Sequence, residues 1–222
     1  MNAVEPLRHD GKWNQSLGEE IANSISHGIG LLAGLIGAPI LLLTTWHGGD
    51  RYLFIGAVVF STAMLLVYFG STLYHAWPPG PLKSLLQVID HSAIFLLIAG
   101  TYTPFTLGPL RGAWGWTILT LVWAVAIFGI ILKSVHGAER RKKLSLTLYL
   151  GMGWLILVAF RPILQHVPLP SLAWLMAGGI AYTAGVFFYV DERRRFTHFV
   201  WHLFVLLGTT CHFFAVFTCT SA

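Results

Sequence analysis

The sequence has few charged residues for its length. Asp, Glu, Lys and Arg make up 10% of its 222 residues, whereas hydrophobic residues make up 55% and the mean hydropathy is +0.68. Soluble globular domains carry about 25% charged residues. The shortage of charge excludes a soluble domain and indicates an integral membrane protein.

Cysteine is scarce as well. The two cysteines, Cys211 and Cys219, stand eight residues apart, which is about 12 Å along a helix. This separation is too large for a disulfide bond. A disulfide-stapled scaffold is therefore excluded.

Long polar segments are also missing, and the longest polar connection runs only from Lys133 to Lys143. We therefore expect a cytoplasmic N-terminal segment at 1–20 and one seven-helix transmembrane domain at 21–222, an all-α membrane protein. Because the N-terminus lacks the order of a cleaved signal peptide, we expect the first span to be retained. Each membrane-spanning helix needs about 17 to 25 mostly apolar residues. The expected spans are Ile25 to Thr45, Tyr52 to Trp77, Val88 to Leu107, Ala113 to Leu132, Leu144 to Phe160, Ser171 to Val190 and Thr197 to Thr218.

The distribution of basic residues predicts the orientation of these spans. Lys and Arg gather in loops on the cytoplasmic side of a membrane, and eleven of the 14 basic residues fall on the side of the N-terminus. We expect a cytoplasmic N-terminus and an outside C-terminus. The cytoplasmic set is Arg8, Lys12, Lys83, Lys133, Arg140, Arg141, Lys142, Lys143, Arg193, Arg194 and Arg195; the outer set is Arg51, Arg111 and Arg161.

The net charge of +5 and the isoelectric point near 9.4 do not indicate nucleic-acid binding. The basic residues form short clusters next to the spans, without interleaved aromatic residues. Such clusters contact anionic lipid headgroups. Membrane lipid is therefore the expected partner, no nucleic acid is expected, and the oligomeric state is left open.

Ionisable side chains inside membrane spans are costly, and they commonly mark functional sites. Ser71 and His75 lie four residues apart on the second span in "FGSTLYHAW". Asp90 opens the third span, and His198 and His202 repeat the spacing of four on the seventh. Residues four apart share one face of a helix.

The predicted topology brings these residues to one level of the membrane. The second span ends on the cytoplasmic side, where His75 stands, and the third and seventh spans begin there with Asp90, His198 and His202. His212 lies about 15 Å farther along the last helix, so we expect it outside the cluster as a packing or hydrogen-bonding residue.

Three imidazoles from two helices suit zinc, which in catalytic sites takes three protein ligands and keeps one open position. His75, His198 and His202 are the expected zinc ligands. Asp90 could orient a water molecule or a ligand histidine, and Ser71 could bind the same water or a substrate carbonyl.

Simpler interpretations stay open for each residue. The histidine pair could be hydrogen-bonding contacts between helices, Asp90 could cap the third span, and Ser71 could bond to the carbonyl of residue 67. Glu20 and His27, at the start of the first span, fit polar residues at the membrane interface. No role is assigned to the remaining histidines: His9, His47, His91, His136 and His166.

Four segments together resemble the hemolysin III family, the bacterial branch of the progestin and adiponectin receptor superfamily: "EEIANSISHGIG", "GSTLYHAW", "DHSAIFLLIAGTYTPF" and "HFVWHLFVLLGTTCHFF". The resemblance extends over nearly the whole chain, and it implies a multi-pass protein of a bacterial inner membrane. It implies seven helices with the N-terminus inside, zinc held by residues matching His75, His198 and His202, and Ser71 and Asp90 as the conserved Ser and Asp.

The resemblance also implies intramembrane, metal-dependent hydrolysis, with ceramidase activity proposed for the receptor branch. Our leading hypothesis is a zinc-dependent hydrolase of a lipid amide or ester at the cytoplasmic leaflet, with Asp90 and Ser71 as catalytic residues. The alternatives are a nonenzymatic membrane protein with structural zinc, which senses or modulates membrane state, and a cytolysin.

Overall fold

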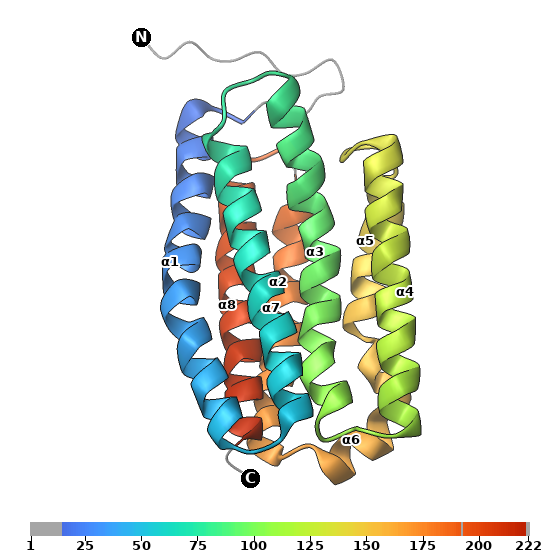
Figure 1. Ribbon diagram of the computed structural model, residues 1–222. Helices are drawn as coiled ribbons and strands as arrows, with labels where there is room; N and C mark the ends of the chain where they lie inside the picture. Colours follow the sequence, from blue (N-terminus) through green and yellow to red (C-terminus); the bar gives the residue numbers. More distant parts are fainter. Residues whose placement is uncertain (1–14, 192, 221–222) are drawn as a thin grey trace.

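The computed structural model describes residues 15–191 and 193–220, which form a bundle of roughly parallel helices (Figure 1). Within these residues every regular element is helical, so the expected all-α class is confirmed. The elements are α1 (Leu17–His47), α2 (Arg51–Ala76), α3 (Pro81–Leu107), α4 (Ala113–His136), α5 (Lys142–Gly153), the 3-10 helix η1 (Leu155–Ala159), α6 (Phe160–His166), α7 (Leu169–Val190) and α8 (Thr197–Cys219).

Among the described residues, seven helical segments are long and apolar enough to cross a membrane. Six are single helices, and the seventh, Lys142–His166, consists of α5, η1 and α6. The seven spans match the number expected from composition. Cys211 and Cys219 are both free, as their spacing predicts.

Two spans begin earlier than expected from hydropathy. Helix α1 begins at Leu17 rather than near Ile25, because Ser16 and Glu19 form a capping box that satisfies the first backbone N–H groups. It thus includes the end of the expected 1–20 segment, of which residues 1–14 lie outside the described residues. Helix α3 begins at Pro81 rather than near Val88, with proline in its first turn.

The fifth span is broken in the middle, although the sequence suggests one continuous helix. Between α5 and α6 the backbone tightens into η1, and the hydroxyl of Tyr102 on α3 compensates for the break. It donates to the carbonyls of Met152 (2.7 Å) and Gly153 (3.0 Å) and accepts from the N–H of Ile156 (3.0 Å). Irregular backbone at membrane depth requires such partners, so Tyr102 stabilises this part of the span.

Two apolar clusters form the core. One contains fully buried Leu41, Phe60 and Val216, from α1, α2 and α8. The other contains Phe95 of α3 and Val122 of α4, with contacts from the broken fifth span. Helix α3 contributes to both clusters and therefore occupies the middle of the bundle.

The close contact of Gly56 on α2 with α3 predicts that a larger residue at this position lowers the stability of the protein. A Cβ atom at this position would collide with the backbone of Pro104 on α3, which cannot rotate away. We expect Gly56→Ala to lower the free energy of unfolding by about 1–3 kcal/mol, the usual cost of overpacking, measured by thermal unfolding in detergent. Gly151→Ala on α5 is the control, because a Cβ there meets nothing within 4 Å; equal stability of both variants would refute the close contact.

The start of α1 and the end of α8 lie at opposite ends of the bundle (Figure 1). The α2–α3, α4–α5 and α7–α8 connections share the end at which α1 starts (Figure 1). Together with the adjoining helix turns, they carry nine of the 14 basic residues. Contrary to the expectation from the sequence, Lys133 does not lie in a loop. It is buried in the last turn of α4, where its side chain donates a hydrogen bond to the carbonyl of Ala138. The cytoplasmic orientation of this end remains a prediction from the charges.

Candidate metal centre

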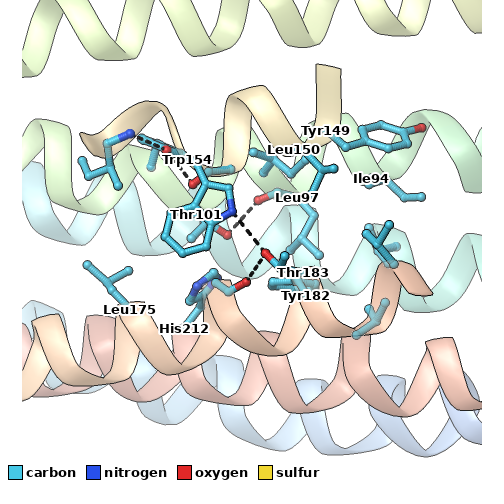
Figure 2. A pocket seen from close by; sticks show the side chains of 18 of the residues that line it. Ile94, Leu97, Thr101, Tyr149, Leu150, Trp154, Leu175, Tyr182, Thr183 and His212 are labelled. Carbon is cyan, nitrogen blue, oxygen red and sulfur yellow. Dashed lines mark hydrogen bonds between the residues drawn. The ribbon is translucent and has the colours of Figure 1, made fainter. Parts of the chain in front are cut away.

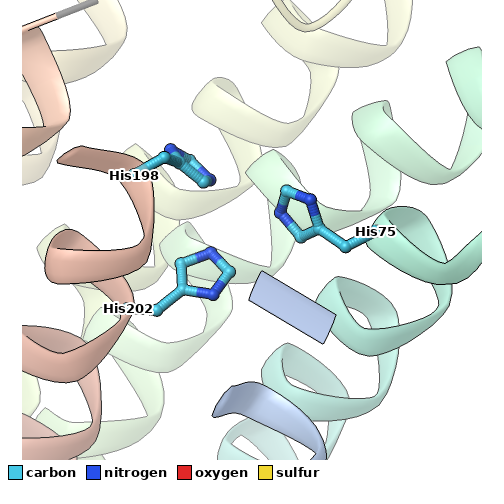
Figure 3. Close-up of side chains that lie close together, drawn as sticks. All are labelled: His75, His198 and His202. Atoms are coloured by element: carbon cyan, nitrogen blue, oxygen red, sulfur yellow. The ribbon is translucent and has the colours of Figure 1, made fainter. Parts of the chain in front are cut away.

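Three histidines meet at the end of the bundle where α1 starts (Figure 3). His75 stands in the last turn of α2, and His198 and His202 stand on one face at the start of α8. One ring nitrogen of each lies within 4.8 Å of the others. Since α2 and α8 run in opposite directions, the end of one meets the beginning of the other.

Hydrogen bonds fix the tautomers of two of these imidazoles. The Nδ1 atom of His75 lies 2.7 Å from Oε2 of Glu20, and Nδ1 of His202 lies 3.2 Å from the carbonyl oxygen of Asn23. Nδ1 of His202 also lies 3.1 Å from the hydroxyl oxygen of Ser26, which donates its own proton to the carbonyl of Asn23 and therefore accepts from His202. A carboxylate and a carbonyl only accept, so both Nδ1 atoms carry the proton and both Nε2 atoms present a lone pair. Buried Nε2 atoms of His75 and His198 have no hydrogen-bond partner. These unpaired nitrogens fit the donor set of a metal ion.

Ser71 and Asp90 lie beside this cluster on the wall of one cavity. The Ser71 side chain is fully buried beside Asp90 and makes no hydrogen bond to the carbonyl of residue 67, so that alternative is wrong. Asp90 is buried in the third turn of α3, and the alternative of an N-cap is therefore also wrong. Both side chains face the interior of the bundle and not the membrane surface.

Helix α1 supplies part of the centre, which the sequence interpretation missed. The ring of His27 stacks on that of His202, with centroids 3.7 Å apart and planes 6° apart, and both His27 nitrogens lack hydrogen-bond partners. Glu20 and Asn23 support His75 and His202. The spacing of Glu20, Asn23 and His27 at i, i+3 and i+7 is that of one helical face, and this face of α1 contacts the histidine cluster.

His91 was assigned no role, yet it lies buried on α3 and contributes to the cavity wall. The Tyr149 hydroxyl donates to its backbone carbonyl (2.7 Å). His212 lies outside the cluster, as expected, and its ring contacts Tyr182 with centroids 5.4 Å apart. His9 lies outside the described residues. In His47, His136 and His166, Nδ1 bonds to the carbonyl four residues earlier.

An elongated cavity of ≈ 240 Å³ joins the cluster to the middle of the bundle. This volume far exceeds the roughly 10–15 Å³ that a cavity needs to hold one water molecule. Its wall is mostly apolar and is formed mainly by α3, the broken fifth span, α7 and α8. Figure 2 shows its deeper part, where the Trp154 indole donates to Thr183 (3.1 Å) near Tyr182 and His212. The shape suits a long apolar ligand that reaches the histidines at one end.

Seven membrane spans, with three imidazoles gathered where one apolar cavity ends, define a multi-pass membrane protein with a buried candidate metal site. The family model described as "Haemolysin-III related" matches residues 15–213, and the chain belongs to this family. It is 42% identical over 198 residues to "Hemolysin-3 homolog" of Bacillus subtilis, covering 89% of this chain and 92% of the relative.

Two further relatives extend the comparison. "Hemolysin-3" of Bacillus cereus is 42% identical over 205 residues, which cover 92% of this chain and 93% of the relative. The human "Monocyte to macrophage differentiation factor" is 27% identical over 220 residues, which cover 93% of this chain and 87% of the relative. The resemblance to the hemolysin III family is thus confirmed, with a distant link to the wider superfamily. The bacterial relatives agree with a bacterial inner membrane.

Proposed function

We propose that the chain is a zinc-dependent hydrolase that cleaves an amide or ester bond of a membrane lipid. The observation that carries this proposal is the convergence of three imidazoles, with buried, unpaired Nε2 atoms on His75 and His198, at one end of an apolar cavity. A nitrogen-lined polar end and an apolar body match the two parts of such a lipid.

Zinc is the metal that this donor set favours. Imidazole nitrogens suit zinc, and three protein ligands with one open position are typical of catalytic zinc sites. Zinc bound there would supply Lewis acidity, which activates water at neutral pH. His75, His198 and His202 would hold the ion, and the described residues bring no thiolate into the cluster.

Asp90 and Ser71 are the chain's groups for the chemical step. As a carboxylate, Asp90 accepts hydrogen bonds and could take a proton from water. The hydroxyl of Ser71, which is buried beside Asp90, could donate to the carbonyl oxygen of the substrate. The apolar wall would hold the acyl chain and exclude water from the rest of the cavity.

The substrate would come from the membrane at the basic end of the bundle. Basic residues near a membrane surface attract anionic headgroups by about 1 kcal/mol each. We assign this end to the cytoplasmic leaflet, so the lipid would reach the cavity from that leaflet.

A structural role for zinc is the second candidate. The cluster joins the end of α2 to the start of α8, and a bound ion would link these two helices. A protein of this kind would sense or modulate membrane state without turnover. The name of the Bacillus cereus relative, "Hemolysin-3", suggests cytolysis; leakage from liposomes upon addition of the purified protein tests that possibility.

Lipid analysis of a deletion strain tests the hydrolase without assuming a particular substrate. We expect a lipid amide or ester to accumulate in the deletion strain, and complementation with the wild-type gene to reverse this. Complementation with His198→Ala should fail at equal protein level in the membrane. If His198→Ala restores the lipid profile fully, the histidine cluster is not needed for turnover and the hydrolase proposal is wrong.

A further inference from the structure

We propose that Glu20 and Lys83 are positioning residues for the metal centre. Glu20 holds the imidazole of His75 with Nε2 directed at the cluster, and Lys83 holds Glu20. The inference rests on the proposed zinc site and adds two residues, from α1 and α3, to its function.

The contact between His75 and Glu20 determines what His75 can do. Its Nδ1–H donates to Oε2 of Glu20 over 2.7 Å, and the His75 side chain is completely buried while that of Glu20 is 18% exposed. A carboxylate bonded to Nδ1 fixes both the tautomer and the ring orientation of a metal-binding histidine. Without it, the ring could rotate or carry its proton on Nε2, where a proton blocks metal binding.

Lys83 keeps the Glu20 carboxylate in place. Its Nζ atom lies 3.0 Å from Oε1 of Glu20, so each carboxylate oxygen has a different partner. Lys83 also donates to the carbonyls of Tyr74 (3.1 Å) and Trp77 (3.0 Å) at the end of α2. An ammonium has three donors, and all three are used here. Lys83 therefore joins α3 to the end of α2 and to α1.

The support of His75 differs from that of His202, because it depends on one side chain. The Nδ1 atom of His202 has two partners, the hydroxyl of Ser26 (3.1 Å) and the backbone carbonyl of Asn23 (3.2 Å), and a side-chain substitution at Asn23 leaves the carbonyl in place. His75 depends on the side chain of Glu20. Since Glu20 and Asn23 lie one turn apart, α1 provides the support on which ligands from α2 and α8 rest.

Zinc affinity of the purified full-length protein, measured by competition with a chelator, tests this role. Loss of an outer partner of a metal ligand costs about 10–100-fold in affinity, so we expect that loss for Glu20→Ala. Glu20→Gln should lose less, because its amide oxygen still accepts from Nδ1. Lys83→Met should weaken binding less than Glu20→Ala, and the double variant should bind zinc like Glu20→Ala alone, because Lys83 acts through Glu20. Glu139→Gln, which removes an acid from the α4–α5 loop, should retain wild-type affinity.

The tautomer of His75 gives a second readout that needs no metal. In zinc-free protein labelled with ¹⁵N-histidine, we expect the His75 signal, identified by its absence in His75→Ala, to report the Nδ1–H tautomer, and Glu20→Ala to remove this preference. If Glu20→Ala leaves the tautomer and the zinc affinity unchanged and lowers only the melting temperature, Glu20 is merely a link between helices and the inference is overturned. If the wild type binds no zinc, the proposed function fails, whereas the tautomer experiment still decides whether Glu20 positions His75.

Discussion

Replacing Asp90 by asparagine is expected to lower lipid turnover by about 10²–10⁴-fold, the usual contribution of a general acid or base. The substitution keeps the shape of the side chain but removes its capacity to accept a proton. Asp90 is buried on the cavity wall. The three candidate metal ligands are the histidines, so Asp90 is not one of them. Zinc content should therefore stay at the wild-type level, which separates a chemical effect from loss of the metal.

The measurement is hydrolysis by purified protein of the lipid that accumulates in the deletion strain, with zinc content determined on the same samples. Ser71→Ala should reduce turnover less than Asp90→Asn, because the proton acceptor is still present. Glu139→Gln serves as the control for loss of an acidic residue outside the cavity. Wild-type turnover by zinc-loaded Asp90→Asn would show that this carboxyl group takes no part in the reaction.

Replacing His75 by alanine is expected to weaken zinc binding by more than about 100-fold, because loss of an outer partner alone costs 10–100-fold. The remaining pair, His198 and His202, comes from a single helix and lacks the facing ligand. A ligand present at 100 times its dissociation constant stabilises a folded protein by about 2.7 kcal/mol. Zinc should therefore raise the melting temperature of the wild type and leave that of His75→Ala nearly unchanged.

His212→Ala is the matched control for this experiment. His212 stands on α8, like two of the clustered histidines, but lies about 15 Å from His202 along the helix. Its variant should keep both the zinc affinity and the zinc-dependent rise in melting temperature. If His75→Ala binds zinc as tightly as His212→Ala does, the ion is held somewhere else.

Much of the architecture could be predicted because membrane spans follow from composition and length. The convergence of the histidines could be predicted as well, since alternate helix ends meet at one membrane level and the spacing of His198 and His202 places them on one face. Hydropathy does not show where polar helix ends begin, so the capping box at Ser16 was overlooked.

The remaining features depend on contacts between residues far apart in the sequence. The break in the fifth span is compensated by Tyr102, about fifty residues earlier. The role of Glu20 depends on a contact with His75 across two helices. Polar residues at the start of a span look alike in sequence whether they face headgroups or the interior, so the sequence does not show that this face of α1 contacts the cluster.

X-ray absorption at the zinc K-edge of the purified wild-type protein, with His202→Ala in parallel, tests the central claim most directly. The account predicts about one zinc ion per chain, with imidazole nitrogens at about 2.0–2.1 Å, and loss of this signal in His202→Ala. A wild-type protein that binds no zinc, or a zinc environment that is identical in His202→Ala, would contradict it.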